Sequence, residues 1–320
     1  MKKINAYEVA KLAHVSPATV SRAINHRQQV NQQTLRQIDD AMAKLGFVSA
    51  PTGPKTVIVN VQSLDNIFYL EVLKGLQAGA RQNNLHLLID QTVITATNIK
   101  DYLNFIERFH PYGIIVLNQL AVPVLQQLNQ VCRLVQCCEH NPSADLPFVG
   151  IDDQQAASKA TNYLLATGCR QLCFINTKDH NRYAQRRLDG FRQALQGHHV
   201  TANPAWLLAL NAIDFNEALP AIEQLFNANQ VPDAFVCVSD TFAAAVLKVA
   251  SKYHRRVPAD ISVIGFDNTL ISNTVQPTLS TVNIPCFQEG FSAIQLLTNS
   301  YQQNQQIILP TELLIRQSTK

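Results

Sequence analysis

The 320-residue sequence lacks any apolar run near the roughly 20 residues that a membrane-crossing helix requires. Its first stretch, MKKINAYEVAKLAHV, has two lysines but no continuous apolar segment and no small-residue cleavage site, so it predicts no secretory signal. These absences favour a cytoplasmic protein and argue against a membrane protein. Hydrophobic residues still make up 47% of the chain, which is enough for the cores of two or three domains.

Recognisable catalytic and metal-binding motifs are also missing. The sequence has no glycine-rich phosphate loop, no nucleophile elbow and no HExxH pair, so we expect no enzyme activity and no cofactor. Its seven cysteines include two suggestive pairs, Cys137-Cys138 and Cys169-x3-Cys173, but no histidine completes a zinc-ligand spacing. Because most of the cysteines lie in apolar, strand-like runs, we expect reduced thiols in the core and no bound metal.

Charge is unevenly distributed along the chain. Residues 1–55 hold eight lysines or arginines and three carboxylates, a net charge of +5, whereas the remaining residues hold 18 basic and 20 acidic side chains, a net charge of −2. A basic N-terminal piece on a slightly acidic body is typical of a nucleic-acid-binding module joined to a ligand-binding domain. Charge alone does not exclude a basic tail that binds nothing in particular.

Three short helices are predicted in the first 47 residues. Asn5 followed by Glu8 fits a capping box at the start of the first helix. Ser16 can cap a second helix, with Pro17 at its first position, where the missing N–H group costs nothing. Asn31 can cap a third. Because the first two helices are joined by only two or three residues, they must cross steeply, which is the helix-turn-helix arrangement.

The second helix presents an outer face suited to DNA. It offers short side chains that can donate to phosphate oxygens and one arginine that can reach a guanine edge. These residues are Ser16, Ala18, Thr19, Ser21, Arg22 and Asn25. A purely structural helix would more often carry long Glu/Lys pairs at such positions, so the pattern favours DNA binding.

One continuous stretch of the sequence reads AYEVAKLAHVSPATVSRAINHRQQVNQQTLRQIDDAMAKLGF. It closely resembles the DNA-binding headpiece of the LacI–GalR family of bacterial repressors. The resemblance implies that Pro17, Ala18 and Arg22 face bases in the major groove. It implies phosphate contacts from Tyr7, Ser16, Thr19, Ser21, Asn25, Asn31 and Thr34. His14 departs from the family, which usually has glycine in this turn; if the residue adopts a positive φ, histidine costs about 1 kcal/mol there.

The connection that follows the headpiece also departs from the family. Residues 48–56, VSAPTGPKT, contain Pro51, Gly53 and Pro54, which predict an extended tether. The family's longer connection has a Pro-Asn-x-x-Ala-Arg-x-Leu pattern, which folds on DNA as a hinge helix and inserts apolar side chains into the minor groove. Because the Ala-Arg-x-Leu part is absent here, we expect less DNA bending and a different half-site spacing.

From Val57 onward, short apolar runs alternate with amphipathic helical stretches. Seven of the runs read as strands that are apolar on both faces, which predicts parallel sheets covered on both sides. They are residues 57–61, 85–90, 113–118, 132–138, 171–176, 234–239 and 261–266. This many strand–helix units favours an α/β core of two doubly wound parallel-sheet lobes over a single sheet.

Polar and aromatic side chains follow several of these strands, at the sheet edge where such folds bind ligands. Carboxylates, an arginine and aromatic rings together suit a polyhydroxylated ligand. They lie at residues 66–69, 152, 239–240 and 267–268, together with Arg186 and Arg187. Structural explanations stay open, because Asp240 can cap a helix and Arg187 can pair with Asp189.

The body of the chain is similar to the periplasmic-binding-protein-like core of the same family, in pieces such as RRLDGFRQAL, VSDTFAAAVL and PADISVIGFDN. This resemblance implies effector contacts from Phe68, Arg187, Phe215, Asp240 and Asp267. It also implies a homodimer, which suits a headpiece that reads two half-sites. The segment CCEHNPSADLP matches the family too poorly to assign any residue within it.

The sequence thus predicts an all-α three-helix headpiece joined to a periplasmic-binding-protein-like α/β core. The predicted parts are a helix-turn-helix headpiece (1–47), a shortened linker (48–56) and an effector-binding and dimerisation core (57–320). Within the core, one lobe would hold residues 57–150 and 283–308, and the other residues 151–282 and 309–320.

We therefore predict a sequence-specific transcriptional regulator that binds operator DNA as a homodimer. It would repress carbohydrate transport or catabolism genes and respond to a small sugar-like effector bound between the lobes. Two alternatives stay open: a DNA-binding regulator without an effector, and a sugar-binding protein without a regulatory role. An export signal would favour the second alternative, whereas this chain has a basic headpiece.

Overall fold

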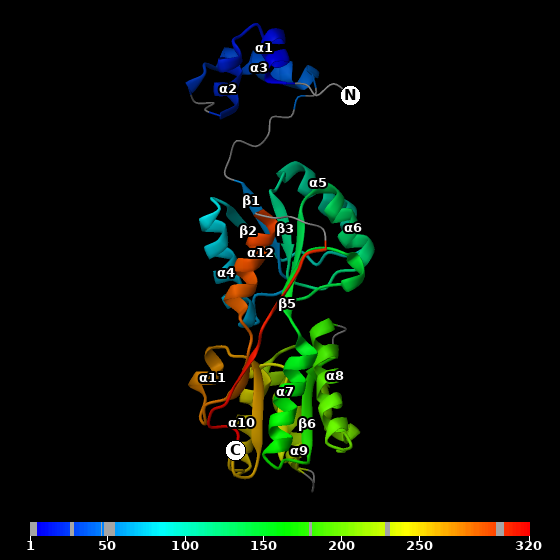
Figure 1. Cartoon of the computed structure of the whole chain (residues 1–320). Coiled ribbons are helices and arrows are strands. Elements are labelled where there is room, and N and C mark those ends of the chain that lie inside the picture. The colour runs from blue at the N-terminus through cyan, green and yellow to red at the C-terminus, as the bar shows by residue number, and fades with distance from the viewer. Residues whose placement is uncertain are drawn as a thin grey trace. The chain divides into compact units, whose positions relative to one another are not determined.

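The computed structural model describes residues 5–25, 29–45, 47, 55–178, 181–227, 231–298 and 304–320. The chain divides into two compact units, residues 1–55 and residues 56–320, and each is described by itself (Figure 1). Within the described ranges, no helix is both long and apolar enough to span a membrane. All seven cysteines are free, and five of them are buried.

The N-terminal unit contains three helices, α1 (Ala6–Leu12), α2 (Pro17–Asn25) and α3 (Gln32–Leu45). The capping box predicted for α1 is present. Asn5 Oδ1 accepts hydrogen bonds from the N–H groups of Tyr7 and Glu8, and the Glu8 carboxylate accepts one from the N–H group of Asn5. Buried Val9, Val20 and Ile38 hold the three helices together.

The predicted caps of the other two helices are also confirmed. The Thr19 N–H group donates to Ser16 Oγ at 3.1 Å, and the Thr34 N–H group donates to Asn31 Oδ1 at 2.8 Å. Each cap satisfies an N–H group that the helix leaves unpaired and contributes about 1 kcal/mol. In the turn between α1 and α2, His14 has a φ of 54°, so the left-handed conformation anticipated at this position is present.

The larger unit holds two six-stranded sheets. The first is entirely parallel, with the strand order β11–β5–β4–β3–β1–β2. Its strands are β1 (Thr56–Asn60), β2 (His86–Asp90), β3 (Gly113–Val116), β4 (Leu134–Cys137), β5 (Phe148–Ile151) and β11 (Gln306–Leu309). Its helices are α4 (Phe68–Gln82), α5 (Ile99–Phe109), α6 (Val122–Val131) and α12 (Cys286–Thr298). Helices α4 and α12 cover one face of the sheet, and α5 and α6 cover the other (Figure 1).

The second sheet has the order β12–β10–β9–β8–β6–β7, and only β12 among these strands runs antiparallel to its neighbour. Its strands are β6 (Leu172–Thr177), β7 (Leu207–Leu210), β8 (Ala234–Cys237), β9 (Ser262–Asp267), β10 (Ser280–Asn283) and β12 (Glu312–Leu314). Its helices are α7 (Asp153–Ala166), α8 (Arg182–Gly197), α9 (Phe215–Asn227), α10 (Asp240–Lys252) and α11 (Leu270–Thr274). Helix α7 packs on α8, and α9 packs on α10.

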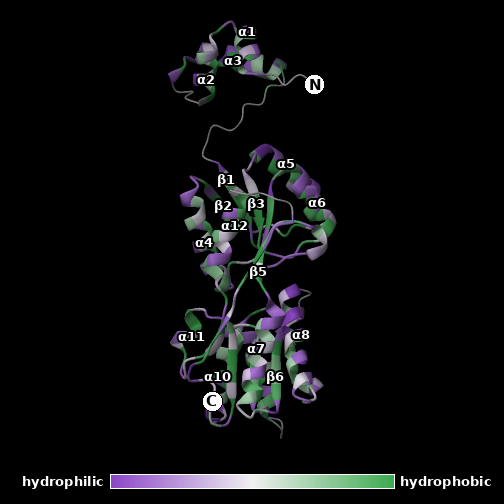
Figure 2. Ribbon diagram, viewed as in Figure 1, coloured by the Kyte–Doolittle hydropathy of each residue, from purple (hydrophilic) through white to green (hydrophobic). Residues whose placement is uncertain are grey.

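The central strands are buried on both faces because helices cover both faces of each sheet, whereas the edge strands β2, β7, β11 and β12 are partly exposed. Every residue of β3, β4, β6 and β8 is buried, and Figure 2 shows hydrophobic strands beside helices with hydrophilic outer surfaces. All seven predicted strands are present. The sequence analysis did not predict β5, β7, β10, β11 and β12, which are three or four residues long.

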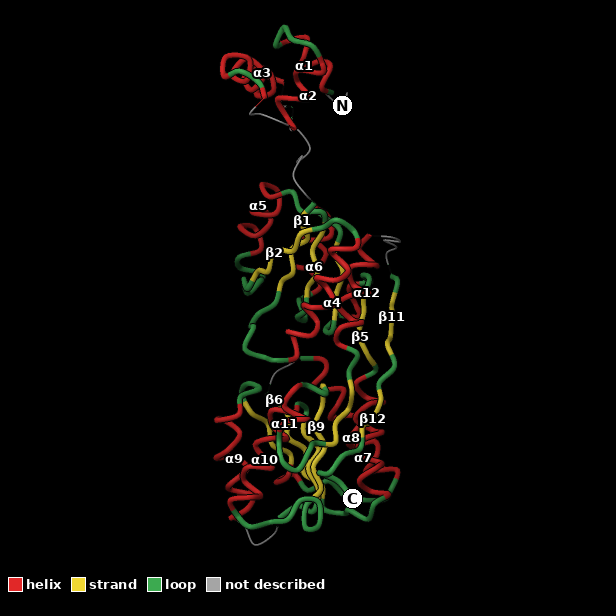
Figure 3. The backbone as a smooth tube through the Cα atoms, turned by 90° about the vertical axis from the view of Figure 1, so that its left-hand side faces the viewer, coloured by secondary structure: helices red, strands yellow, loops and turns green. Residues whose placement is uncertain are grey.

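The chain passes between the two sheets three times. The crossings run from β5 to α7, from β10 to α12 and from β11 to β12 (Figure 3). Each sheet with its helices forms one lobe of this unit. Side chains that follow strands of both sheets then meet in the space between the lobes, which is where open α/β folds bind ligands.

Glycines allow α4 and α12 to pack very closely. A Cβ atom on Gly75 would lie 1.9 Å from the carbonyl oxygen of Phe287, and one on Gly290 would lie 2.1 Å from that of Val72. Any other residue would therefore force the helices apart. This contact fixes the first turn of α12, which carries Glu289.

Candidate functional site

The outer face of α2 carries most of the side chains predicted to contact DNA bases. Pro17, Ala18, Ser21 and Arg22 are exposed, whereas Val20 of the same helix is fully buried in the headpiece core. The helix thus turns a small-residue face with one arginine outward. A helix that enters the major groove needs such a face, because long side chains would hold it away from the bases.

The predicted phosphate contacts lie around the starts of the helices. Ser16 Oγ and Thr19 Oγ1 lie 2.8 Å apart at the start of α2, where the helix dipole and N–H groups favour an anion. Tyr7 on α1 is 70% exposed. Asn31 and Thr34 are joined by the cap of α3.

Two predicted features fall outside the described part of the chain. They are the side chain of Asn25 and residues 48–54 of the linker. The absence of a hinge helix therefore stays a prediction.

A cavity of about 310 Å³ lies between the lobes of the larger unit. Phe68, Arg187 and Asp267, three residues predicted to contact the effector, line it together. Other polar and aromatic lining residues are Gln62, Ser63, Asp65, Asn66, Tyr69, Asn118, Cys138, Glu139, Asp153, Asn181, Tyr183, Asp214 and Glu289. Both lobes contribute, so a ligand in the cavity would contact both. Its size and mixed lining suit a small polar molecule.

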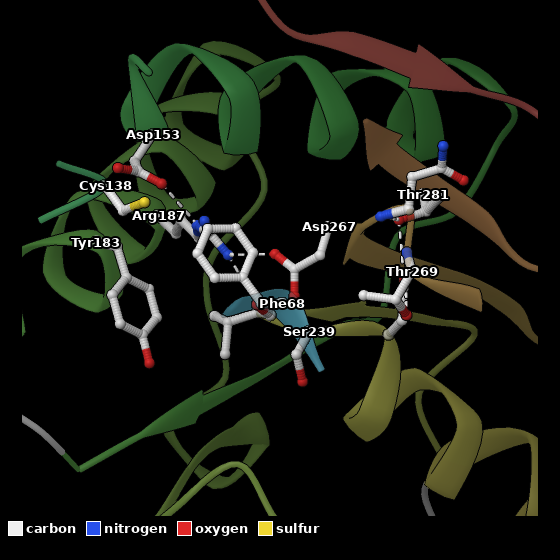
Figure 4. A network of polar contacts seen from close by, with 12 residues as sticks. Phe68, Cys138, Asp153, Tyr183, Arg187, Ser239, Asp267, Thr269 and Thr281 are labelled. Atoms are coloured by element: carbon white, nitrogen blue, oxygen red, sulfur yellow. Dashed lines mark hydrogen bonds and ion pairs between the residues drawn. The ribbon is translucent and has the colours of Figure 1, made fainter. Parts of the chain in front are cut away.

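Arg187 is the central charge of this site, and Figure 4 shows it between two carboxylates. Its side chain is only 5% exposed. Nε donates to Asp153 at 2.8 Å, and a terminal nitrogen donates to the Val238 carbonyl at 2.7 Å and lies 3.8 Å from Asp267. The guanidinium lies 4.3 Å from the centre of the Phe266 ring. These contacts hold it rigidly, and the predicted alternative partner Asp189 is not among them.

Asp267 ends β9 in an unusual backbone conformation, with a φ of 99°. Burial raises the pKa of its carboxyl to about 7, although Arg187 acts in the opposite direction. The carboxyl is therefore poised to gain or lose a proton near neutral pH.

On the first lobe, Asn66 Oδ1 accepts a hydrogen bond from the Phe68 N–H group, and the Phe68 ring meets the Tyr69 ring edge-on, with 5.3 Å between the ring centres.

The other two predicted effector residues do not line this cavity. Asp240 is 1% exposed and accepts hydrogen bonds from the Thr269 N–H group, the Thr269 hydroxyl and the Thr281 hydroxyl. It joins α10 to α11 and β10, while the cap of α10 is Ser239. Phe215 begins α9 and packs against the hydrophobic core, and the preceding residues 212–214 reach the cavity.

Several lining residues were missed by the sequence analysis, among them Cys138, Glu139 and Glu289. Cys138 and Glu139 follow β4, so the strand-end rule could have identified them, but they lie in the segment that matched the family poorly. Glu289 lies in the first turn of α12, and no local signal marks it. Its hydrogen bond from Cys138 joins residues 151 positions apart.

Glu139 also connects the two lobes. Its carboxylate accepts hydrogen bonds from the N–H groups of Arg182 and Tyr183, at 3.1 and 2.9 Å, and thereby caps α8 of the second lobe. Gln119 of the first lobe accepts from the same Arg182 N–H group. Burial raises the pKa of Glu139 to about 7, while these N–H groups lower it. The lobes are therefore held together by hydrogen bonds at the edge of the cavity.

Comparison with known proteins matches both units. Residues 5–49 match the family described as bacterial regulatory proteins, lacI family, and residues 161–319 match the periplasmic binding protein-like domain. The chain belongs to the LacI family. It is a DNA-binding transcriptional regulator and not an enzyme, as predicted from the sequence.

The relatives of this LacI-family regulator extend over nearly its full length. It is 29% identical to the HTH-type transcriptional repressor CytR of Escherichia coli K12, over 98% of this chain and 95% of the relative. It is 28% identical to catabolite control protein A of Staphylococcus epidermidis, over 99% of each. The crystal structure of a LacI transcriptional regulator from Bacillus cereus subsp. cytotoxis has a TM-score of 0.76, with 25% identity, over 84% of this chain and 99% of that one.

Proposed function

We propose that this regulator is a homodimeric repressor of carbohydrate transport or catabolism genes, controlled by a small sugar-like effector in the cavity. The observation that carries the proposal is the convergence of Phe68, Arg187 and Asp267 on one cavity from distant parts of the chain. An aromatic face beside a rigid charged pair suits a polyhydroxylated ligand. The relatives named as a repressor and as a catabolite control protein support the regulatory role.

The effector would act by favouring one arrangement of the lobes. Because residues of both lobes line the cavity, a ligand that contacts both stabilises one arrangement over others. DNA affinity changes only if the two arrangements also differ in their affinity for the operator.

The effector proposal is tested by thermal melting of the full chain with a panel of sugars and nucleosides. Each compound that raises the melting temperature is then added to a gel shift with operator DNA. Phe68→Ala should weaken the binding of an active compound about tenfold, since a buried aromatic contact is lost. Phe105→Ala removes an exposed ring on α5 and serves as the control. If no stabilising compound alters DNA affinity, the effector-independent alternative replaces the proposal.

For DNA, the proposed base contacts are Pro17, Ala18 and Arg22. The proposed phosphate contacts are Tyr7, Ser16, Thr19, Ser21, Asn25, Asn31 and Thr34. The exposure of the α2 surface and the net charge of +5 on residues 1–55 support this assignment.

The DNA contacts are tested on an operator selected from random-sequence DNA. Arg22→Ala should lower operator affinity 10- to 100-fold, because one base contact is worth about 1–3 kcal/mol. Its affinity for random DNA should change much less. Arg36→Ala, on the exposed side of α3, removes the same charge as a control. Equal losses on operator and random DNA would rule out a base contact.

The short linker supports a binding mode with little bending. Gel mobilities of circularly permuted operator fragments should then differ little between positions of the site. A strong dependence of mobility on position would show a central kink and contradict this expectation.

The proposed dimer would use an apolar groove formed by α4, β2 and α11. Exposed Ile67, Leu70, Ile89 and Leu270 line it, and Leu270 is 72% exposed. We assign this surface to a second copy of the chain, because a two-fold dimer presents two headpieces to two half-sites. Helix α4 belongs to the first lobe and α11 to the second, so a partner at this groove would contact both lobes.

Sedimentation of the full chain tests this surface. Leu270→Asp should shift the protein from dimer to monomer, because a charge buried in the interface would be unpaired. Val131→Asp alters another exposed apolar residue, at the end of α6, and should leave the dimer intact. A dimer unaffected by Leu270→Asp would place the interface elsewhere.

A further inference from the structure

The cavity between the lobes is lined by an excess of acidic side chains. Among the described residues that line it, six carry carboxyl groups and only Arg187 carries a positive charge. The carboxyls belong to Asp65, Glu139, Asp153, Asp214, Asp267 and Glu289. Asp65 and Asp214 are exposed, whereas Glu139, Asp267 and Glu289 are buried. A buried carboxylate is unfavourable in the folded chain unless it has a cation or several hydrogen-bond donors.

The positive charge of Arg187 is shared by two of these carboxyls. It donates to Asp153 and forms a longer ion pair with Asp267. Its other hydrogen bond among the described residues goes to the Val238 carbonyl. Arg187 therefore has little capacity left to balance a further carboxylate.

Three more carboxyls have donors of their own. Glu139 accepts two N–H groups from the start of α8. Asp214 accepts from the Glu217 N–H group at 2.7 Å, and Asp65 accepts from the Ser63 hydroxyl at 2.9 Å. These groups are satisfied by the chain.

Glu289 differs from the other five. It is 1% exposed, and its only hydrogen bond among the described residues comes from the Cys138 thiol at 3.5 Å. A thiol is a weak donor. Burial raises the pKa of Glu289 to about 8, with a further contribution from Asp153. Among the described residues, no N–H group donates to this carboxyl and no cation lies within ion-pair distance of it, although Arg187 lowers its pKa from farther away.

Asn118 is a second polar group in the lining that lacks a partner. It is 8% exposed, and its Nδ2 atom has no hydrogen-bond partner among the described residues. Buried amide donors are normally paired with protein, water or ligand. The unpaired amide therefore points to a ligand with an oxygen atom that can accept a hydrogen bond from Asn118 Nδ2.

We propose that the effector carries a protonated amine, which binds Glu289, on a polyol framework such as that of an amino sugar. The inference rests on the proposed function, since it takes this cavity as the effector site. The ammonium group would supply the charge that Glu289 lacks, and a ligand oxygen would accept from Asn118. Phe68, drawn beside Arg187 in Figure 4, lines the same cavity, as does Tyr69, and aromatic faces also attract cations.

Binding of the amine would release one proton. The ligand enters as an ammonium ion, the Glu289 carboxyl loses its proton to solvent, and the carboxylate–ammonium pair remains. The ionisable groups that act on Glu289 are Cys138, Cys286, Asp153, Asp267 and Arg187. Since Glu289 holds its proton below about pH 8, affinity should rise up to tenfold between pH 6 and pH 7.

The test uses the full chain and matched sugars. Glucosamine, galactosamine and mannosamine are each compared with their N-acetyl derivative and parent hexose, by thermal melting and by calorimetric titration at pH 6 and pH 7. At least one amino sugar should raise the melting temperature more than its two neutral counterparts do. Glu289→Gln, which keeps the shape and removes the charge, should weaken its binding at least tenfold and reduce the pH dependence, of which only the part due to Asp267 and Glu139 would remain. Asp189→Asn makes the same change at an exposed residue of α8 outside the cavity.

The proposal is overturned if no amino sugar stabilises the protein more than its neutral counterparts. It is also overturned if Glu289→Gln binds the amino sugar as tightly as the wild type does. A neutral sugar that stabilises the protein and alters operator binding would refute the amine while leaving the proposed function intact. Operator binding by the wild type, measured in parallel, reports on that function independently.

Discussion

Replacing Arg187 with methionine removes the charge around which the cavity is built. The guanidinium is 5% exposed and contacts Asp153, Asp267 and the Val238 carbonyl. Breaking a buried ion pair in this way costs about 3–5 kcal/mol, because the carboxylates lose their partner while staying buried. In a unit of this size, that loss lowers the melting temperature by roughly 10 °C.

The loss of stability should grow with pH. The pKa of Asp267 is about 7 in the folded protein, against 3.8 for an ordinary aspartate, so ionising this carboxyl destabilises the fold as the pH rises to about 7. Arg187 holds this pKa down, and without it the pKa rises further. The variant then keeps a proton that the wild type releases, and its stability falls by about 1.4 kcal/mol more for each pH unit above 7 until the raised pKa is reached.

Thermal melting followed by circular dichroism at pH 6 and pH 8.5 measures both effects. Arg186→Met removes the neighbouring charge on α8 and should lower the melting temperature by about 1–2 °C at most. The fall in melting temperature caused by Arg187→Met, relative to the wild type, should be clearly larger at pH 8.5 than at pH 6. A deficit that does not depend on pH, or one equal to that of Arg186→Met, would refute the electrostatic role assigned to Arg187.

Three further substitutions test the fold. His14→Gly should stabilise the headpiece by about 1 kcal/mol, visible by scanning calorimetry, because glycine adopts a positive φ without strain; no gain would mean that the turn imposes no cost. Gly290→Ala should lower the core melting temperature by roughly 10 °C, since its Cβ atom would lie 2.1 Å from the Val72 carbonyl oxygen. Gly197→Ala, with nothing within 4 Å, is its control, and similar melting temperatures for the two would contradict the close packing of α4 and α12. Asp240→Asn should cost about 2–3 kcal/mol in chemical denaturation, because one amide oxygen cannot accept from three donors, and wild-type stability would show that they find other acceptors.

The headpiece was predicted almost completely from the sequence. The caps formed by Asn5, Ser16 and Asn31 join atoms two or three residues apart, so the local sequence determines them. The resemblance marked position 14 as one where the family usually has glycine, and the structure gives His14 a positive φ. The seven predicted strands could be recognised because each lies in an apolar run of the sequence.

The cavity was predicted only in part. Phe68, Arg187 and Asp267 carried two signals, their place after a strand or on a characteristic helix and their family resemblance, and the structure brings them to one cavity. Asp240 carried the same signals, yet its carboxylate is turned into a buried network with Thr269 and Thr281. Strand-end position restricts where a residue lies but does not fix the direction of its side chain.

The sequence by itself determined the helix-turn-helix and the α/β character of the core, because these depend on short-range hydrogen bonds and on the periodicity of burial. The family followed from the resemblance of the quoted stretches. Only the tertiary structure decided which charges share the cavity. Glu289 meets Cys138 because the close packing of α12 against α4 brings its first turn to the end of β4. Contacts between residues so far apart in the chain depend on sheet order and helix packing, which no local pattern encodes.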